Sequence, residues 1–183
     1  FKPLLYTLGV MNGYTPETNM PGGPIDMGGK MIDGNGGPMA ICLAFSKNPA
    51  AVHLINQLGV QRTIDFAKQC GIVNEIPPYP SIALGSADLS LFEMVQAFSM
   101  FPGRGFNVKP NFISRIEDRN GNVLASFRAE TKEVISESEA FIMTKMLQGV
   151  VDFGTGRALR GGYAVPGQIA GKTGTTNDNA DGW

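Results

Sequence analysis

The stretch GQIAGKTGTTNDN, residues 167–179, contains a Gly-Lys-Thr sequence that two unrelated chemistries use. A phosphate-binding Walker A loop needs four residues between its first glycine and the Gly-Lys pair, because that length wraps backbone amides around a phosphate before a helix begins. Here only three residues separate Gly167 from Gly171, and the residues after Thr173 are poor helix formers. The spacing therefore argues against a phosphate-binding loop.

Residues 168–175 instead suggest a β-strand, in which successive side chains point to opposite faces. Lys172 would share one face with Gly174, while Thr173 and Thr175 would share the other. A glycine inside such a strand usually marks a bulge or the close approach of a ligand or another backbone. The pattern predicts an edge strand that can bind an anion. Taken alone, however, such a pattern more often indicates a solvated lysine on an edge strand.

Composition favours a single globular domain with a sizeable core, because the chain has 183 residues, of which 43% are apolar and 17% charged. With a net charge of −1 and no basic cluster, the chain has no broad positive electrostatic potential to attract nucleic acid. We therefore expect no nucleic-acid partner. The longest apolar run, residues 39–45, is far shorter than the roughly 20 residues that span a bilayer. We therefore expect neither a transmembrane segment nor a signal peptide in this stretch.

The cysteines and the histidine predict no metal site. Cys42 and Cys70 lack the spacing of metal ligands, and His53 is the only histidine. No serine or aspartate can be matched to His53 as a triad partner from the sequence, so we assign it no role. Two buried free thiols are the expected state of the cysteines.

Glycines and prolines divide the chain into short units, most of which are helical or loop. Ser90, followed three residues later by Glu93, predicts a capping box at the start of one helix. Segments 112–117 and 123–127 flank Asn120-Gly121, which predicts a two-stranded ribbon. Helical periodicity predicts helices over residues 3–11, 38–45, 49–58, 61–70, 90–101 and 138–151.

Two further short motifs each allow an ordinary structural interpretation. In Ser46-Lys47-Asn48-Pro49, Asn48 could cap the helix that begins at Pro49. In Phe1-Lys2-Pro3, the lysine at the head of a helix is usually a solvated charge. Considered together with Lys172-Thr173-Gly174, which follows them along the chain, the two motifs suggest a functional rather than a structural role.

In order and separation the three motifs resemble those of the penicillin-binding transpeptidases, which use Ser-x-x-Lys, then Ser-x-Asn, then Lys-Thr-Gly. The resemblance covers essentially the whole chain. The double threonine and the Asn-Asp after it resemble the bifunctional class A penicillin-binding proteins rather than a β-lactamase. Stretches that resemble this class are FKPLLYTLGVMNGYTPET, AFSKNPAAVHLINQLG, IALGSADLSLFEMVQAFSMF and AGKTGTTNDNADGW.

The resemblance implies an α+β fold, in which helices pack on a mainly antiparallel sheet. This chain would hold mainly the helical part, with the strand over 168–175 as one piece of the main sheet and the hairpin as a peripheral addition. We expect residues 1–183 to be a partial penicillin-binding transpeptidase domain, truncated at both ends. The serine of Ser-x-x-Lys would lie three positions before Lys2, and therefore outside this chain.

The same resemblance assigns roles to the first two motifs. A serine hydroxyl becomes a nucleophile when a nearby base takes its proton, and a lysine can be that base if burial and cationic neighbours lower its pKa. Lys2 would be this base. Ser46 could relay a proton to the leaving amine, while the Asn48 amide could hold the substrate carbonyl and orient Lys2.

The third motif would bind the substrate. Lys172 would add positive potential at the catalytic site, and Gly174 would let the substrate approach the backbone. The hydroxyls of Thr173 and Thr175 could bind the terminal carboxylate of the donor peptide. The backbone N–H of Thr175 could give half of an oxyanion hole, and the N–H of the absent serine the other half.

On this interpretation the parent protein is a serine-type D,D-transpeptidase that cross-links peptidoglycan stem peptides and is acylated by β-lactams. The chemistry requires no metal or organic cofactor. The family also implies an extracytoplasmic location, a membrane anchor and an upstream glycosyltransferase domain. The fragment itself would be inactive, and its unpaired strand would favour self-association.

Two alternatives come from other functional classes. A related serine β-lactamase would share the motifs, but it needs a base for the deacylating water, and no Glu-x-x-x-Asn segment lies between Asn48 and Lys172. A non-catalytic module could bind peptidoglycan or another protein through the same groove. The residues that precede Phe1 in the natural protein would discriminate between this module and an enzyme.

Overall fold

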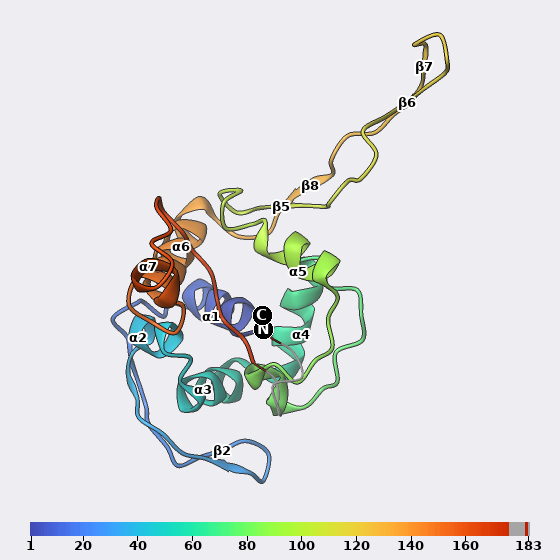
Figure 1. Cartoon of the computed structure of the whole chain (residues 1–183). Helices are drawn as coiled ribbons and strands as arrows, with labels where there is room; N and C mark the ends of the chain where they lie inside the picture. Colours follow the sequence, from blue (N-terminus) through green and yellow to red (C-terminus); the bar gives the residue numbers. More distant parts are fainter. Residues whose placement is uncertain (176–181, 183) are drawn as a thin grey trace.

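A computed structural model of the chain describes residues 1–175 and 182. Helix α1 (Lys2–Met11) lies in the middle of a helical body, with other helices around it (Figure 1). Its central residues Leu4, Leu5 and Tyr6 are completely buried, as expected for a helix that is apolar on nearly all sides. A side chain at Gly9 would meet Leu54 and Met39, so this glycine allows the neighbouring helices to approach closely.

All six predicted helices are present, with ends within a few residues of the prediction. The helix from Ser90 has the predicted capping box but ends at Phe98, three residues early, before a turn that contains Gly103 and Gly105. The helices after α1 are α2 (Met39–Ala44), α3 (Asn48–Leu58), α4 (Val60–Gln69), the 3-10 helix η1 (Pro80–Leu84), α5 (Leu91–Phe98), α6 (Glu137–Asp152) and α7 (Ala158–Gly161).

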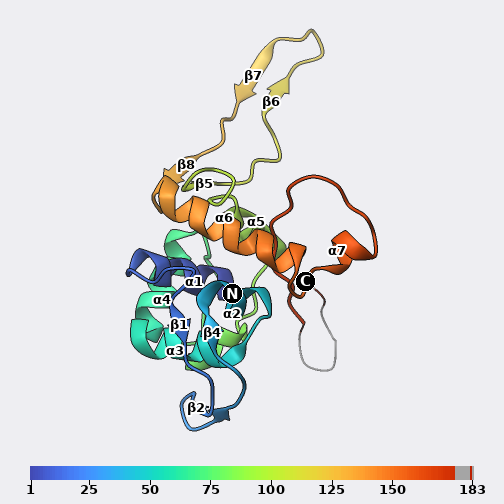
Figure 2. The same cartoon turned by 90° about the vertical axis from the view of Figure 1, so that its left-hand side faces the viewer.

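The strands of the described residues form two-stranded antiparallel pairs rather than one sheet. The predicted ribbon is one of them, and it projects away from the helical body in both views (Figures 1 and 2). Gly121 closes its turn with a φ of +84°, a conformation that favours glycine. The pairs are β1 (Asn19–Met20) with β4 (Gly37–Pro38), β2 (Ile25–Asp26) with β3 (Met31–Ile32), β5 (Phe106–Val108) with β8 (Thr131–Glu133), and β6 (Arg115–Glu117) with β7 (Val123–Ser126).

The strand predicted over 168–175 does not form. A strand needs a neighbour for its backbone hydrogen bonds, and within the described residues the only pairing here is one antiparallel bridge between Thr175 and Gly182. The segment instead runs beside α6, where the Gly171 N–H donates to the Leu147 carbonyl at 3.2 Å. The main-sheet position expected for this segment is therefore not observed.

Both cysteines are free and buried, as predicted. Burial raises the pKa of the Cys70 thiol to about 12, which keeps it protonated and unreactive. Among residues 1–175 and 182, no helix combines the length and apolar character needed to cross a membrane.

Candidate active site

The turn between α2 and α3 carries the Ser-x-Asn motif. After α2 the Lys47 N–H donates to the Cys42 carbonyl at 2.8 Å, and the Ser46 N–H donates to the Leu43 carbonyl at 3.0 Å. This pair of bonds is the Schellman pattern of a helix C-terminus. It places Ser46 at φ +55°, in the left-handed region where glycine is usual. A serine held in this unfavourable conformation marks a candidate functional residue.

Lys2 connects the start of α1 to this turn. Its Nζ donates to the Ser46 carbonyl at 2.8 Å, to Ser46 Oγ at 3.0 Å and to Asn48 Oδ1 at 2.7 Å. These bonds use all three hydrogens of an ammonium group, and Lys2 is only 8% exposed. The structure therefore brings together three residues that the sequence singled out, across 44 and 46 positions.

The capping interpretation of Asn48 is wrong. Lys47 occupies the N-cap position of α3 without a side-chain hydrogen bond, and Asn48 is the first helical residue. The side-chain oxygen of Asn48 accepts from Lys2 instead of from the free amides of its own helix. Lys2 is likewise not a solvated charge, because it is buried and hydrogen-bonded.

The environment of Lys2 lowers its basicity. Burial, and to a smaller extent the positive charge of Lys172, lowers the pKa of Lys2 from its ordinary 10.5 to about 8. Burial also lowers the pKa of Lys172 to about 8. A lysine with such a pKa is roughly one-tenth neutral at pH 7, so it can accept a proton under physiological conditions.

The Lys-Thr-Gly residues lie in the segment that returns from α7 toward the side where α1 begins (Figures 1 and 2). Lys172 Nζ donates to the carbonyl of Thr173 at 2.7 Å, and its charge acts on Lys2. The hydroxyl of Thr173 lies 2.5 Å from that of Thr155. Gly174 and Thr175 are exposed. Within the described residues, no hydrogen bond joins these four positions to Ser46 or Asn48.

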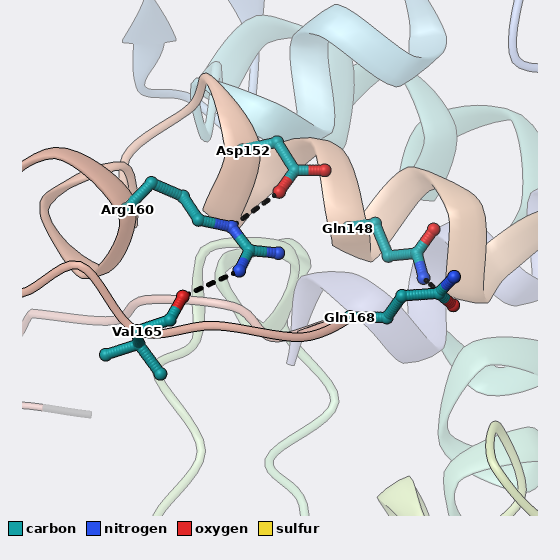
Figure 3. Close-up of polar contacts among 5 residues, drawn as sticks. All are labelled: Gln148, Asp152, Arg160, Val165 and Gln168. Atoms are coloured by element: carbon teal, nitrogen blue, oxygen red, sulfur yellow. Dashed lines mark hydrogen bonds and ion pairs between the residues drawn. The ribbon is translucent and has the colours of Figure 1, made fainter.

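Side chains of α6 and α7 hold the chain that leads into this segment (Figure 3). Arg160 pairs with Asp152 at 2.9 Å through Nε and donates from Nη1 to the Val165 carbonyl at 2.9 Å. Gln148 Nε2 donates to Gln168 Oε1 at 3.4 Å. The partly exposed ion pair contributes only modestly to stability, so its main effect is to fix the path of the chain between α7 and residue 168.

The family described as the penicillin binding protein transpeptidase domain matches residues 1–182. The chain belongs to this family. The sequence therefore correctly indicated a penicillin-binding transpeptidase from its three motifs.

Curated relatives of this transpeptidase domain have the same class of name. Penicillin-binding protein 1A of Neisseria gonorrhoeae is 31% identical over 204 residues, which cover 100% of this chain and 25% of the relative. Penicillin-binding protein 1A of Aquifex aeolicus is 37% identical over 141 residues, covering 77% of this chain and 19% of the relative. These names agree with the predicted class A resemblance, and the chain spans a quarter or less of either relative.

Solved structures share the fold. Penicillin-binding protein 1A from Haemophilus influenzae superposes with a TM-score of 0.88 at 22% identity, over 100% of this chain and 34% of that chain. Penicillin-binding protein A from M. tuberculosis, in its imipenem acyl-enzyme complex, gives 0.79 at 18% identity, over 96% of this chain and 47% of that chain. The predicted α+β class and the partial extent of the fold are thus confirmed.

Two residues beside the candidate site of this transpeptidase domain were not singled out from the sequence. Gly154 packs so tightly on the end of α2 that a Cβ there would overlap the carbonyl oxygen of Ala44. The next residue, Thr155, donates its N–H to the same carbonyl at 3.0 Å. The only sequence signal for these residues was a threonine between two glycines, at positions 154 and 156. It was not enough to single out Thr155, because the residues that Thr155 contacts are distant in sequence.

The described residues contain no group of three or more His, Cys, Asp or Glu side chains placed to hold a metal ion. The polar groups that the structure gathers are the amine of Lys2, the hydroxyl and carbonyl of Ser46 and the amide of Asn48. Such a set can hold and pass protons.

Proposed function

We propose that the protein containing this chain is a peptidoglycan D,D-transpeptidase that works through an acyl-serine intermediate. The observation that carries the proposal is the contact of the buried Lys2 amine with both Ser46 and Asn48. Residues 1–183 would form only part of that protein, because the relatives of known name are about four times longer or more. A serine one helical turn before Lys2 would be the nucleophile.

The acylation step begins with the neutral amine of Lys2. It takes the proton of the serine hydroxyl as the serine oxygen attacks the carbonyl between two D-alanines. The C–N bond of the tetrahedral intermediate then breaks, and the proton passes through the Ser46 hydroxyl to the leaving D-alanine amine. Ser46 suits this relay, because its hydroxyl already accepts a hydrogen bond from Lys2 at 3.0 Å. The amine of a neighbouring stem peptide then attacks the acyl-serine, the ester C–O bond breaks, and the proton lost by the amine passes through Lys2 to the serine oxygen, which completes the cross-link.

Asn48 has a double role in this proposal. Its Oδ1 accepts from Lys2, which orients the amine. An amide whose oxygen is engaged in this way still has two N–H donors on Nδ2. These can hold the peptide carbonyl of the donor substrate, so that one side chain aligns both the base and the substrate.

The Lys-Thr-Gly segment would bind the anionic end of the substrate. Lys172 supplies positive potential near Lys2, and the Thr173 and Thr175 hydroxyls donate to the terminal carboxylate. The Thr175 N–H gives one half of the oxyanion hole. Gly174, which is exposed, allows the substrate backbone to approach. β-Lactams with a carboxylate fit the same groups and would acylate the same serine.

The location follows from the proposed substrate, because peptidoglycan is cross-linked outside the cytoplasm. The protein would work in the periplasm or at the outer face of the cytoplasmic membrane, and an upstream anchor would keep it there. Organic cofactors and metal ions have no role in the proposed steps.

The proposal is tested in a protein that holds the complete transpeptidase domain, by measuring acylation with a fluorescent penicillin. Lys2→Gln should slow acylation by about 100-fold or more, the usual contribution of a general base. Lys68→Gln is the matched control, because Lys68 is an exposed lysine near the end of α4, and its rate should not change. Equal rates for Lys2→Gln and the unsubstituted protein would contradict the assignment of Lys2.

The same preparation separates a transpeptidase from a β-lactamase-like hydrolase. A transpeptidase forms a long-lived penicilloyl adduct and converts stem-peptide substrates into cross-linked dimers. A hydrolase releases the adduct quickly and yields only cleaved monomers. The 183-residue chain itself should remain unlabelled, as judged by intact mass, because the proposed nucleophile lies outside it.

A further inference from the structure

We propose that Thr155 is a positioning residue, which holds and orients the hydroxyl of Thr173 for a carboxylate ligand. The inference rests on the proposed function and adds a residue to its substrate-binding groups. None of the three catalytic motifs includes Thr155, which follows the last turn of α6.

The contacts of Thr155 join two parts of the site. Its Oγ1 lies 2.5 Å from Thr173 Oγ1, across 18 positions of sequence. Its backbone N–H donates to the carbonyl of Ala44 at 3.0 Å. Ala44 is the last residue of α2, two positions before Ser46. Thr155 therefore connects the Lys-Thr-Gly segment to the turn that carries the Ser-x-Asn motif.

The backbone around Thr155 is fixed on both sides. The Gly154 N–H donates to the Gly149 carbonyl at 3.0 Å, and the Gly156 N–H donates to the Val150 carbonyl at 2.9 Å. Gly154 is buried and leaves no room for a Cβ beside Ala44. Because its own backbone is held in this way, Thr155 can act as a fixed support for an exposed hydroxyl that would otherwise rotate freely.

The direction of the hydrogen bond depends on the ligand. A hydroxyl has one hydrogen to donate and two lone pairs to accept with. When Thr173 donates its hydrogen to a carboxylate, the bond between the two threonines must be donated by Thr155. Thr155 then keeps the Thr173 hydrogen directed at the ligand, and the aligned bonds strengthen each other. An uncharged ligand gains less from this arrangement, because hydrogen bonds to charged groups are the stronger ones.

The test uses a protein with the complete transpeptidase domain and acylation by a carboxylate-bearing β-lactam and by its methyl ester. Thr155→Val keeps the shape of the side chain and removes the hydroxyl. It should slow acylation by the carboxylate about threefold to tenfold, as expected for one neutral hydrogen bond. The loss with the ester should be smaller. Thr155→Ser, which keeps the hydroxyl, should react within about twofold of the unsubstituted protein.

A double-mutant cycle isolates the contact with Thr173. Adding Thr155→Val to Thr173→Val should cause little further loss, because the partner is already absent. Thr155→Ala provides a second variant without the hydroxyl if the valine is not accommodated, and melting temperatures show that each variant is folded.

Several results would overturn the proposal: unchanged acylation in Thr155→Val, equal losses with carboxylate and ester, additive losses in the cycle, or a serine variant as slow as the valine. Failure of the unsubstituted protein to be acylated would overturn the proposed function together with this inference. Normal acylation of the unsubstituted protein with an unaffected Thr155→Val would overturn the inference alone.

Discussion

The Nζ of Lys2 lies 2.7 Å from Asn48 Oδ1, a bond that ties the first residue of α1 to the first residue of α3. The same nitrogen bonds the carbonyl and hydroxyl of Ser46. Within the described residues these partners are all uncharged oxygen atoms, so hydrogen bonds rather than a counter-ion compensate for burial of the ammonium group there. This explains physically why the pKa of Lys2 falls to about 8.

The first prediction concerns pH in the complete domain. Protonated Lys2 cannot take the serine proton, so acylation should accelerate as pH rises toward about 8. The pKa of Lys172 is also lowered to about 8, so loss of its positive charge should slow acylation by a carboxylate-bearing β-lactam again at higher pH. Lys172→Gln removes the smaller of the two causes that lower the pKa of Lys2. In Lys172→Gln, the midpoint of the rise in acylation rate with pH should therefore move upward but stay below 10.5, since Lys2 remains buried. The measurement is the acylation rate across about pH 6 to 10 for both proteins.

A matched control is Lys145→Gln, which removes another cation but one that lies over the ring of Phe141 on α6. Its midpoint should equal that of the unsubstituted protein. A Lys172→Gln midpoint that is unchanged, or that moves to lower pH, would contradict the electrostatic coupling.

The second prediction separates strain from chemistry at Ser46. Its φ of +55° suits glycine better than serine, so Ser46→Gly should be more stable than Ser46→Ala by about 0.5 to 1 kcal/mol. Both variants lack the hydroxyl that Lys2 contacts, so both should lose most of the acylation activity. Urea unfolding measures the first effect and fluorescent penicillin the second. Equal stability of the two variants would contradict the prediction, because it would mean that the strain is no larger than the extra conformational entropy that glycine loses on folding.

The helices could be predicted from the sequence because their signals are local. Apolar residues at helical spacing and the pair Ser90 and Glu93 lie within a few positions of one another, and the structure has the capping box they predict. The start of α6 was placed slightly late. Ser136 and Glu139 form a second capping box there, whereas the sequence prediction began the helix at Ser138.

Features that depend on distant partners could not be predicted in the same way. Segment 168–175 alternates like a strand, but a strand exists only beside a neighbour, and the described residues supply one bridge at Thr175. An asparagine directly before a helix predicts an N-cap. The sequence did not show that Lys2, 46 positions away, donates a hydrogen bond to the Asn48 side chain. A role for Thr155 could be inferred only from its hydrogen bonds to Ala44 and Thr173 in the structure. The family resemblance identified the three motifs. The structure shows that Lys2 of the first motif is hydrogen-bonded to Ser46 and Asn48 of the second.

A third prediction concerns self-association of the 183-residue chain. Phe112, which precedes the β6–β7 hairpin, and Leu124, on β7, are 83% and 67% exposed, and exposed apolar surface favours association. At micromolar concentration the chain should scatter light as dimers or larger species. Phe112→Ser with Leu124→Thr should shift it toward the monomer, whereas Arg128→Ser, an exposed polar control nearby, should not. A monomeric unsubstituted chain would contradict this expectation.

The last prediction concerns Thr175, which distinguishes a carboxylate-binding segment from an ordinary exposed loop. Thr175 is exposed, so Thr175→Val, which keeps the branched shape, should barely change the melting temperature of the complete domain. If the hydroxyl donates to the ligand carboxylate, its loss removes about 1.5 to 3 kcal/mol. Acylation by a carboxylate-bearing β-lactam should then fall roughly tenfold to a hundredfold. Thr175→Ser should restore most of the rate, and Thr131→Val, at an exposed threonine of β8, should leave it unchanged. A Thr175→Val protein with both the melting temperature and the acylation rate of the unsubstituted protein would remove Thr175 from the substrate-binding groups, because a hydroxyl that contacts the charged ligand cannot be lost without effect on its rate of reaction.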